Sequence, residues 1–600
     1  MPHAAVARII VILSKAKNLA TRQPPLRLVR GSVVALVPSR SIGYARLVIK
    51  HEIARVVEEA VSRAQAAGDL PSVALPEIVI ERPQRPEHGD YATSLPLRLA
   101  RAARANPLEL GKTLAGHCPP SEAVARVEVA PPGFVNFHLS EAWLARQVDA
   151  VLEAGPAFAQ VAVGRGEKVQ VEFVSANPTG PLHAGNGRWA AIGATLARVL
   201  QAAGYDVQTE YYFNDAGSQV ETFGRTLYAR YQQLFGRDVA VPEDGYAGTY
   251  MIDLAEHARE RFGESMLRAE GEAAPEALAA SGMEQVMDWI RNDLSELGVH
   301  FDHWYREQTV FDAGYFEKVM SLLRERDLVA EREGAVWFAA TQLGADKDEV
   351  IVRSTGMPTY LATDIGYHYD KFLVRNFDRV IDIWGADHQG HVRPVLLAVE
   401  AMGIDPSRLT IIIGQLVTLR RGEELLKISK RSGDIVTLRE VIDEVGKDAC
   451  LFFFLSRSAD APIDFDLELA KRQSAENPVY YVQYAHARIA GILGHAKERL
   501  GETEGGDSAL LTHPAELALV RKMLLLPELV ESMAQALEPH HLPHYSQELA
   551  TAFHDFYEKC RVVDEANAEL SRARLKLAAA AKSVLAISLT LMGMTAPERM

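Results

Sequence analysis

The sequence predicts a multidomain α/β protein, with a parallel-sheet domain lying between a smaller α+β domain and an all-α bundle. Three observations support this prediction. The length of 600 residues is enough for three or four domains. Residues 169–212 show a strand, a helix and a second strand in succession, which is the unit that builds parallel sheets. From about Ser474 to the end, the pattern is wholly helical.

A strand-to-helix corner organises the middle of the chain. Apolar residues alternate over 169–173, as in a strand, and a Pro/Gly-rich turn follows over 177–181. A helix then begins near His183, with apolar residues at helical spacing: Trp189, Ile192, Leu196, Val199 and Leu200. Backbone N–H groups at such a corner can hold an anion, His183 offers a donor, and Gly185 leaves room for a flat ligand. Taken alone, the segment is equally compatible with an ordinary capped helix.

Composition is that of a soluble globular protein, with 24% charged and 48% apolar residues. No apolar run reaches about 18 residues, so we expect no membrane span. The three cysteines, Cys118, Cys450 and Cys560, are far apart in sequence, which argues against a structural zinc site and fits a reducing cytoplasm. A net charge of −15 argues against non-specific coating of nucleic acid, but it leaves room for a local basic groove.

The first 50 residues differ from the rest because they contain no Asp or Glu before Glu52. This basic extension is compatible with an organellar transit peptide, but we favour a disordered extension or a reading frame begun too far upstream. A helical stripe and short strands at 78–80 and 127–129 then indicate the α+β domain. The predicted divisions are 1–50 for the extension, 51–160 for the N-terminal domain, 165–470 for the parallel-sheet domain with a helical insertion at about 236–300, and 474–600 for the bundle.

Polar residues gather where predicted strands of the parallel sheet end. Asn214 and Asp215 follow the strand at 207–212, and Asp387 and His388 follow a buried strand at 380–384. Open α/β sheets bind ligands at this edge. A simple Asx turn accounts for the Asn214 segment equally well.

A further buried strand is expected at 350–353, and a helix from Pro358 would place Tyr360 and Asp364 at i and i+4 on one face. A phenol and a carboxylate together suit a cationic guanidinium, because the carboxylate can accept a charge-assisted, bidentate pair of hydrogen bonds. The alternative is an exposed helix-surface Asp.

The string SANPTGPLHAG, with HAGN at 183–186, resembles the HIGH-motif region of class I aminoacyl-tRNA synthetases and of the arginyl-tRNA synthetases in particular. Asn186 stands where that family usually has a second histidine. LLKISKRSGD at 425–434 resembles the KMSKS motif in its KMSKR form, where two lysines three apart suit the charge that develops as pyrophosphate leaves. PEHGDYATSLPLRLA and PPGFVNFHLS resemble the family's N-terminal add-on domain, and ENPVYYVQYAHARI and TAPERM its anticodon-binding domain.

The resemblance implies a Rossmann-like catalytic domain and an arginine–tRNA ligase that uses ATP with Mg²⁺, L-arginine and tRNA(Arg), as a cytoplasmic monomer without membrane attachment. It implies that catalysis uses His183, Asn186, Lys427 and Lys430. It implies an ATP site of Pro178, His183, Gly185, Asn186, Asp387, His388, Lys427, Ser429 and Lys430. It implies an arginine site of Glu172, Ser175, Asn177, His183, Tyr360, Asp364 and His388. It implies tRNA contacts from Tyr480, Tyr484, Arg488, Arg574 and Met600.

Two other interpretations remain open at this point. A different nucleotidyltransferase could use the same phosphate-binding corner, although the helical C-terminal region would then have no role. A non-catalytic RNA-binding paralogue is the other, although it would be expected to lose phosphate-binding residues such as His183, Lys427 and Lys430, which are present.

Overall fold

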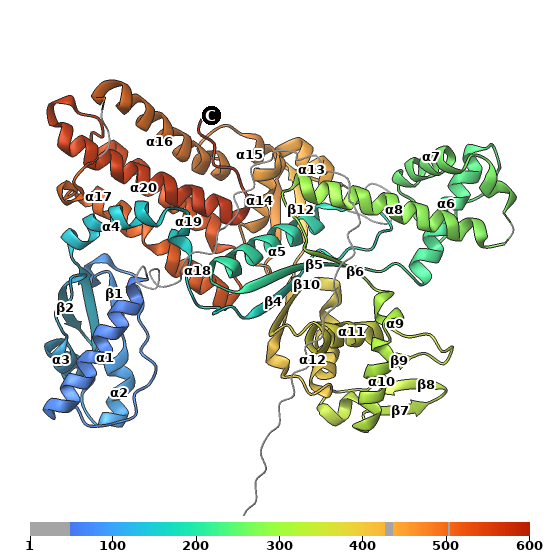
Figure 1. The fold of residues 1–600 in the computed structure, drawn as a ribbon, viewed down its shortest axis with the longest axis horizontal. Coiled ribbons are helices and arrows are strands. Elements are labelled where there is room, and N and C mark those ends of the chain that lie inside the picture. The colour runs from blue at the N-terminus through green and yellow to red at the C-terminus, as the bar shows by residue number, and fades with distance from the viewer. Residues whose placement is uncertain (1–47, 270, 427–435, 502–504) are drawn as a thin grey trace, which may run out of the picture. The chain divides into compact units, whose positions relative to one another are not determined.

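The computed structural model describes residues 48–269, 271–426, 436–501 and 505–600. Its centre is a five-stranded sheet with the order β11-β10-β4-β5-β6, in which every neighbouring pair is parallel (Figure 1). The strands are β4 (Lys168–Glu172), β5 (Asp206–Phe213), β6 (His303–Arg306), β10 (Arg379–Gly385) and β11 (Leu409–Gly414). The predicted parallel-sheet fold is therefore confirmed, and the carboxyl ends of β4, β5, β6 and β10 meet at one edge.

The helix α5 (Ala184–Ala202) connects β4 to β5 and is buried almost all round. The predicted apolar stripe from Trp189 to Leu200 is buried, but the opposite side of α5 is buried as well, because α5 packs against helices from the end of the chain. Gly193 makes close packing on the sheet possible, since a Cβ there would lie 2.1 Å from Cγ of Phe173. Arg188 is fully buried and donates to the carbonyl oxygens of Gln415, Ser458 and Ala461 at 2.7–2.9 Å.

The predicted helical insertion is present between β5 and β6. It follows α6 (Ser218–Leu234) and contains α7 (Tyr250–Phe262) and α8 (Ala273–Glu296). After β6, the chain forms α9 (Thr309–Asp312), α10 (Tyr315–Glu325), α11 (Tyr360–Tyr369), a π-helical turn (Asp370–Val374) and α12 (Val392–Ala401). The predicted helix that carries Tyr360 and Asp364 is α11, with Thr359 at its N-cap.

The expectation of a buried strand at 350–353 is wrong in one respect. This strand, β9 (Glu349–Val352), belongs to an antiparallel sheet with β7 (Val329–Arg332) and β8 (Ala335–Phe338), and only Ile351 of its four residues is buried. A short apolar run has the same appearance in sequence whether it lies in a central or in a peripheral sheet. A third small sheet joins β12 (Val417–Arg421), β13 (Glu424–Leu426) and β14 (Ile463–Asp466), next to α13 (Leu438–Val445), α14 (Lys447–Leu455) and α15 (Leu467–Lys471).

The N-terminal region combines helices with a three-stranded sheet of order β1-β3-β2. Its elements are α1 (Ile49–Ala67), β1 (Tyr91–Thr93), α2 (Leu95–Ala103), α3 (Pro107–His117), β2 (Val124–Ala130), β3 (Phe134–Leu139) and α4 (Glu141–Ala154). The apolar stripe of α1 is buried as predicted, and residues 127–129 lie in β2. The strand expected at 78–80 is wrong, because these residues are half-buried and extended without a strand partner; pairing begins only at Glu81, which bridges Ala92.

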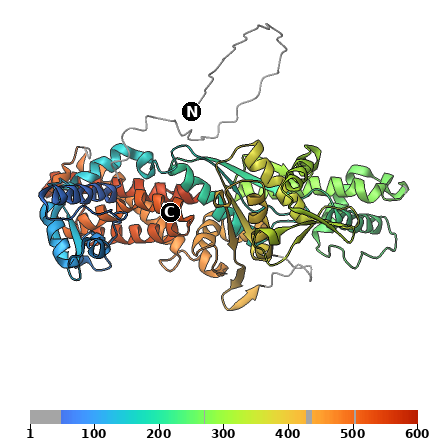
Figure 2. The same cartoon turned by 90° about the horizontal axis from the view of Figure 1, so that it is seen from below.

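The C-terminal region is helical throughout, as predicted. Its helices are α16 (Pro478–Leu500), α17 (Pro514–Met523), α18 (Leu525–Ala536), α19 (His541–Lys559) and α20 (Ala568–Met592). Helices α16, α19 and α20 lie side by side (Figures 1 and 2). By length and composition α20 is apolar enough to cross a membrane, but most of it is buried between the other helices, which explains its composition as that of a core helix.

Candidate active site at the carboxyl edge of the sheet

The start of α5 is fixed by a reciprocal cap between His183 and Asn186. The backbone N–H of Asn186 donates to Nδ1 of His183 at 3.3 Å, and the backbone N–H of His183 donates to Oδ1 of Asn186 at 3.1 Å. Because Nδ1 accepts, the proton of the neutral imidazole lies on Nε2. Glycine is also favoured at position 185 by local packing, since a Cβ there would lie 2.9 Å from the His183 imidazole. Asn186 thus acts as a cap that orients the histidine.

The lysine segment lies outside the described residues, which include neither Lys427, Ser429 nor Lys430. Its downstream flank is described and meets the α5 corner. Thr437 forms a β-bridge with His183, and the N–H of Leu438 donates to the carbonyl oxygen of Leu182 at 2.7 Å. The two motifs, about 240 residues apart in sequence, are therefore joined by backbone pairing directly after the lysine segment.

Glu172 ends β4 and is part of a buried charge network. Lys371, from the π-helical turn after α11, contacts Oε2 of Glu172 at 2.6 Å and Oδ1 of Asp382 at 2.8 Å. His368 contacts the other oxygen of Asp382 at 3.0 Å, and Ser175 donates to Oε1 of Glu172 at 2.9 Å. Burial raises the pKa of Glu172 in spite of the ammonium beside it, whereas Lys371 and His368 overcome the effect of burial and hold the pKa of Asp382 at about 2.

The loop after β4 has a strained backbone. Val174 and Ser175 adopt positive φ values of 70° and 41°, which β-branched valine in particular rarely does. Tyr211 of β5 stabilises this shape, because its hydroxyl donates to the carbonyl oxygen of Ala176 at 2.8 Å and accepts from the N–H of that residue at 3.2 Å. The strain positions the segment that follows, in which Asn177 donates to Oε1 of Gln219 at 2.7 Å. Pro178, next in the chain, is buried.

Asp364 faces other acidic side chains. Burial raises its pKa to about 7, against the opposing effect of His368 and with further contributions from the carboxylates of Glu172, Glu307 and Asp382. Within the described part of the chain, no side chain or backbone N–H donates to the Asp364 carboxylate. Tyr360, one turn earlier on α11, is 53% exposed. A group of facing carboxylates with so little compensation suits a cationic ligand.

Glu307 is a residue that sequence reasoning missed. It follows β6 directly, is 7% exposed, and has a pKa raised by burial. Thr363 and Tyr212 hydrogen-bond to this side chain, but none of the described residues donates to its buried Oε2. The available signal was position, since Glu307 lies at the same sheet edge as Glu172, but the four-residue strand β6 was too short to be recognised from the sequence.

Asp387 and His388 lie on the turn after β10, as predicted, and both side chains are open to solvent. The exposed fractions are 84% for Asp387 and 60% for His388, and the nearest oxygen–nitrogen distance between them is 3.7 Å. The structure therefore brings them to the correct edge, beside Trp384, whose ring centre is 6.1 Å from that of His388.

The C-terminal candidates divide into two groups. Tyr480 and Tyr484 are stacked on α16 with ring centres 5.9 Å apart, and Arg488 lies over Tyr557 at 4.5 Å. His554 of α19 stacks on Tyr484 and extends this surface. Arg574, in contrast, binds the buried carboxylate of Glu516 at 2.7 Å within the bundle.

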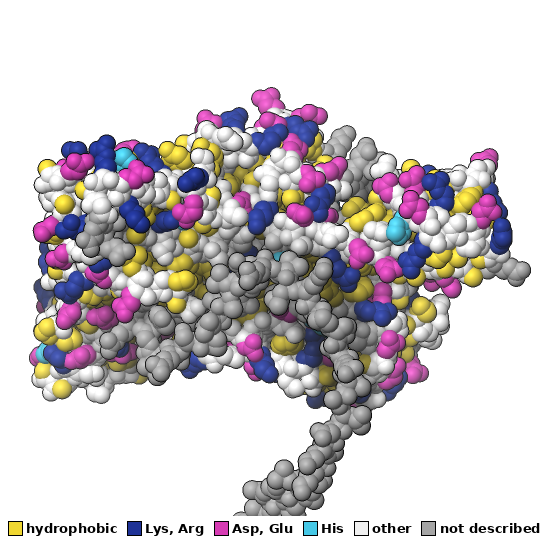
Figure 3. Space-filling view, turned by 45° about the horizontal axis from the view of Figure 1, so that its top comes forward, with side chains coloured by type: hydrophobic (Ala, Val, Ile, Leu, Met, Phe, Trp, Pro, Cys, Tyr) yellow, Lys and Arg dark blue, Asp and Glu magenta, His cyan; other side chains and the backbone are white. Residues whose placement is uncertain are grey.

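Charge gives no simple indication of an RNA-binding face. On the side shown in Figure 3, Lys and Arg side chains are interspersed with Asp and Glu instead of forming one basic stripe. Met600, the last residue, is 55% exposed. Aromatic and arginine contacts on α16 and α19 are therefore a better guide to an RNA surface here than net charge.

Comparison with known families matches three consecutive parts of the chain. The model described as "Arginyl tRNA synthetase N terminal domain" matches residues 48–139. The model described as "tRNA synthetases class I (R), catalytic domain" matches residues 147–453, and the "DALR anticodon binding domain" matches residues 482–600.

Individual relatives show the same similarity over nearly the whole chain. The sequence is 52% identical to an arginine–tRNA ligase of Dehalococcoides mccartyi over 92% of this chain and 99% of that protein. It is 47% identical to an arginine–tRNA ligase of Heliobacterium modesticaldum, over 92% of this chain and 99% of the relative. The fold is similar to that of the Thermus thermophilus arginyl-tRNA synthetase, with a TM-score of 0.72 and 22% identity over 92% of this chain and 100% of that one.

Proposed function

The chain belongs to the arginyl-tRNA synthetase family, and on that premise we propose which of its residues bind the substrates. It is an arginine–tRNA ligase: it activates L-arginine with ATP to arginyl-adenylate and transfers the arginyl group to tRNA(Arg). The two other interpretations, a different nucleotidyltransferase and a non-catalytic paralogue, are thereby set aside. What remains is how this chain's own side chains perform the reaction.

Asp364 and Glu307 together bind the arginine guanidinium. The observation that carries this proposal is the unpaired, buried Oε2 of Glu307 beside a second carboxylate that lacks any described donor. A guanidinium presents five donors in a planar fork, so it can satisfy both acids at once and restore their ionised forms. Tyr360 borders this subsite from the first turn of α11.

The other end of arginine is held by the loop after β4. Glu172 accepts from the α-ammonium, with Ser175 and Asn177 as additional polar partners. Lys371 already neutralises much of the negative charge on Glu172. Glu172 therefore acts mainly as a hydrogen-bond acceptor that the ion pair holds in a fixed orientation. His183 and His388 complete the arginine site near the carboxylate that reacts.

ATP binds at the start of α5. Nε2 of His183 donates to phosphate, Gly185 and Pro178 admit the nucleotide, and Asn186 fixes the imidazole through the reciprocal cap. Asp387 and His388 line the nucleotide side of the same edge. We assign Lys427, Ser429 and Lys430 to the phosphates of ATP as well, and the pairing of Thr437, which follows them in the chain, with His183 supports this assignment.

The chemistry is direct displacement at phosphorus. An oxygen of the arginine carboxylate attacks the α-phosphate of ATP, the bond to the β-phosphate breaks, and pyrophosphate leaves. Bound with ATP, Mg²⁺ would offset phosphate charge. No side-chain nucleophile is required, so the protein contributes positioning and stabilisation of developing charge. The terminal ribose hydroxyl of tRNA then takes the arginyl group and AMP is released.

The tRNA surface includes Tyr480, Tyr484 and Arg488 on α16 and the C-terminal Met600. We add His554 of α19 to this surface because its ring stacks on Tyr484. Arg574 is left out, because its guanidinium is held by Glu516 inside the bundle.

We place the domain divisions at 51–160, 165–470 and 474–600, supported by the three matched ranges. The enzyme acts as a cytoplasmic monomer without a membrane anchor and without a cysteine-ligated structural zinc site; its free cysteines, in separate parts of the fold, support the last statement.

The experiment that tests the arginine site is Glu307→Gln, with Glu317→Gln as the matched control on the exposed face of α10. Pyrophosphate exchange is measured with arginine, with and without tRNA, and as a function of each substrate. We expect the KM for arginine to rise by about a hundredfold in Glu307→Gln, because a hydrogen bond between charged groups contributes about 1.5–3 kcal/mol, while the KM for ATP stays unchanged. An unaltered KM for arginine would remove Glu307 from the site.

A further inference from the structure

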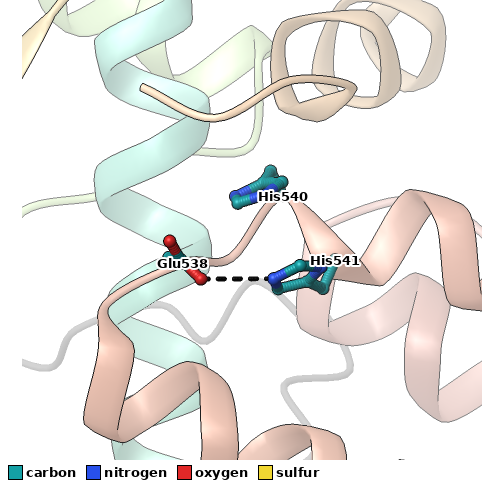
Figure 4. Close-up of side chains that lie close together, drawn as sticks. All are labelled: Glu538, His540 and His541. Carbon is teal, nitrogen blue, oxygen red and sulfur yellow. Dashed lines mark hydrogen bonds and ion pairs between the residues drawn. The ribbon is translucent and has the colours of Figure 1, made fainter. Parts of the chain in front are cut away.

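A cluster of metal-binding residue types lies far along the chain from the residues proposed for catalysis. It consists of Glu538, His540 and His541, where the connection after α18 enters α19, with the Glu538 carboxylate facing His541 (Figure 4). One ligand atom from each residue lies within 4.8 Å of the others. Aminoacylation as derived above makes no use of these side chains.

The distances fit a small tetrahedral ion. Zinc binds histidine nitrogen and carboxylate oxygen at about 2.0–2.2 Å, so two ligands of one tetrahedral ion lie about 3.3–3.5 Å apart. Nε2 of His541 and Oε2 of Glu538 are 3.3 Å apart. His540 offers a ring nitrogen within 4.8 Å of both, and its ring centre lies 4.2 Å from that of His541.

Within the described residues, no hydrogen bond commits the His540 side chain to another role. Its ring lies beside the His541 ring, and it makes no side-chain cap for α19, although it occupies the N-cap position. The next histidine, His544, is already committed, because its Nε2 contacts the carbonyl oxygen of Ser456 at 3.1 Å.

We propose that Glu538, His540 and His541 form a surface site for a borderline divalent cation, Zn²⁺ in the first place, with water at the fourth position. Two imidazoles and one carboxylate select zinc and its neighbours in the transition series over Mg²⁺ and Ca²⁺, which prefer oxygen ligands. The bound ion ties the end of the α18 connection to the first turn of α19.

The test uses the full chain, stripped of metal with a chelator and titrated with zinc chloride by calorimetry near neutral pH. The variants are His540→Gln, His541→Gln and Glu538→Gln. The matched control is His495→Gln, because His495 is also an exposed histidine with an acidic neighbour, Glu498 at 4.0 Å. The chain contains 19 histidines, so the comparison between variants decides the result, and the total zinc uptake does not.

We expect one zinc ion to be lost in the three site variants and retained in the control. Loss of an outer-sphere partner alone weakens metal sites by about 10–100-fold, so removal of a direct ligand should weaken this site by about a hundredfold or more. Cobalt in place of zinc should give visible absorption of a tetrahedral site in the parent and control proteins only. Zinc should also raise the melting temperature of the parent protein but not of the site variants.

Equal zinc affinity in all proteins would overturn the proposal and would mean adventitious binding at other histidines. Absence of saturable zinc binding in the parent protein would overturn it as well, leaving Glu538 and His541 as a surface ion pair at the start of α19. Neither readout depends on arginylation, so these results are independent of the assigned catalytic roles.

Discussion

Replacing Asp364 with asparagine tests the arginine site most directly. Asparagine has the same shape but no charge, so it cannot form the bidentate ionic pair with a guanidinium. Removing one partner of a buried ion pair costs about 3–5 kcal/mol. Glu307 remains to hold the other side of the guanidinium, so we expect the lower part of this range, about 3–4 kcal/mol, which corresponds to a decrease of about 150- to 900-fold in kcat/KM for arginine.

The same structure predicts that this substitution leaves stability intact. In the described part of the protein no group donates to the Asp364 carboxylate, so no native hydrogen bond is lost, and a costly buried charge disappears above neutral pH. The assays are tRNA arginylation at pH 8 with varied arginine, and the urea midpoint at the same pH. Unchanged arginine kinetics would refute the assignment of Asp364 as a ligand of the substrate. A loss of unfolding free energy as large as the free-energy loss calculated from kcat/KM would refute it too, because the substitution would then act through stability.

Four further predictions concern the same site. The pKa of Asp364 is about 7, above its ordinary value of 3.8, so kcat/KM for arginine should fall as pH decreases below about 7, and Asp364→Asn should flatten this limb of the profile. The raised native pKa also means that folding takes up a proton at Asp364 between pH 3.8 and about 7, so the contribution of Asp364 to stability decreases as pH rises through that range. The urea midpoints of the parent protein and of Asp364→Asn, measured over this pH range, test this prediction. Lys371→Met should lower stability by about 3–5 kcal/mol, because it removes the ammonium that lies between two buried carboxylates. Lys318→Met on the exposed face of α10 should change stability by less than about 0.5 kcal/mol, and equal urea midpoints for the two variants would contradict this prediction. Lys430→Ala should slow adenylate formation in single-turnover assays far more than it weakens tRNA binding, and equal losses would assign this segment to RNA.

The parts of the fold that the sequence predicts well are those with long, regular patterns. The βαβ unit around α5, the α1 stripe and the helical C-terminal region have clear periodicity, and the structure has all three. Residues 78–80 and 350–353 are short apolar runs without flanking periodicity, and such runs do not reveal whether they pair or in which sheet. The two predictions made for these runs were wrong for the same physical reason, because residues far away in the sequence decide which strands pair.

The site could be predicted only where its residues belong to local motifs. His183, Glu172 and Asp364 lie in recognisable strings, and the structure brings the segments that carry them to one sheet edge. Lys371, Asp382 and Glu307 carry no local signal, because their roles depend on partners up to about 200 residues away. The reciprocal cap of Asn186 on His183 was also hidden, although it explains how asparagine serves at a position where the family usually has histidine.

The two contacts of Lys371, with Glu172 and with Asp382, have a consequence for the evolution of this enzyme. Neutral replacement of Lys371 leaves two carboxylates in the protein interior without their ammonium, so a variant with this single change folds poorly. We therefore expect the residues at positions 172, 371 and 382 to be kept together or replaced together along a lineage. A library that randomises all three at once should recover functional combinations that no series of single substitutions reaches.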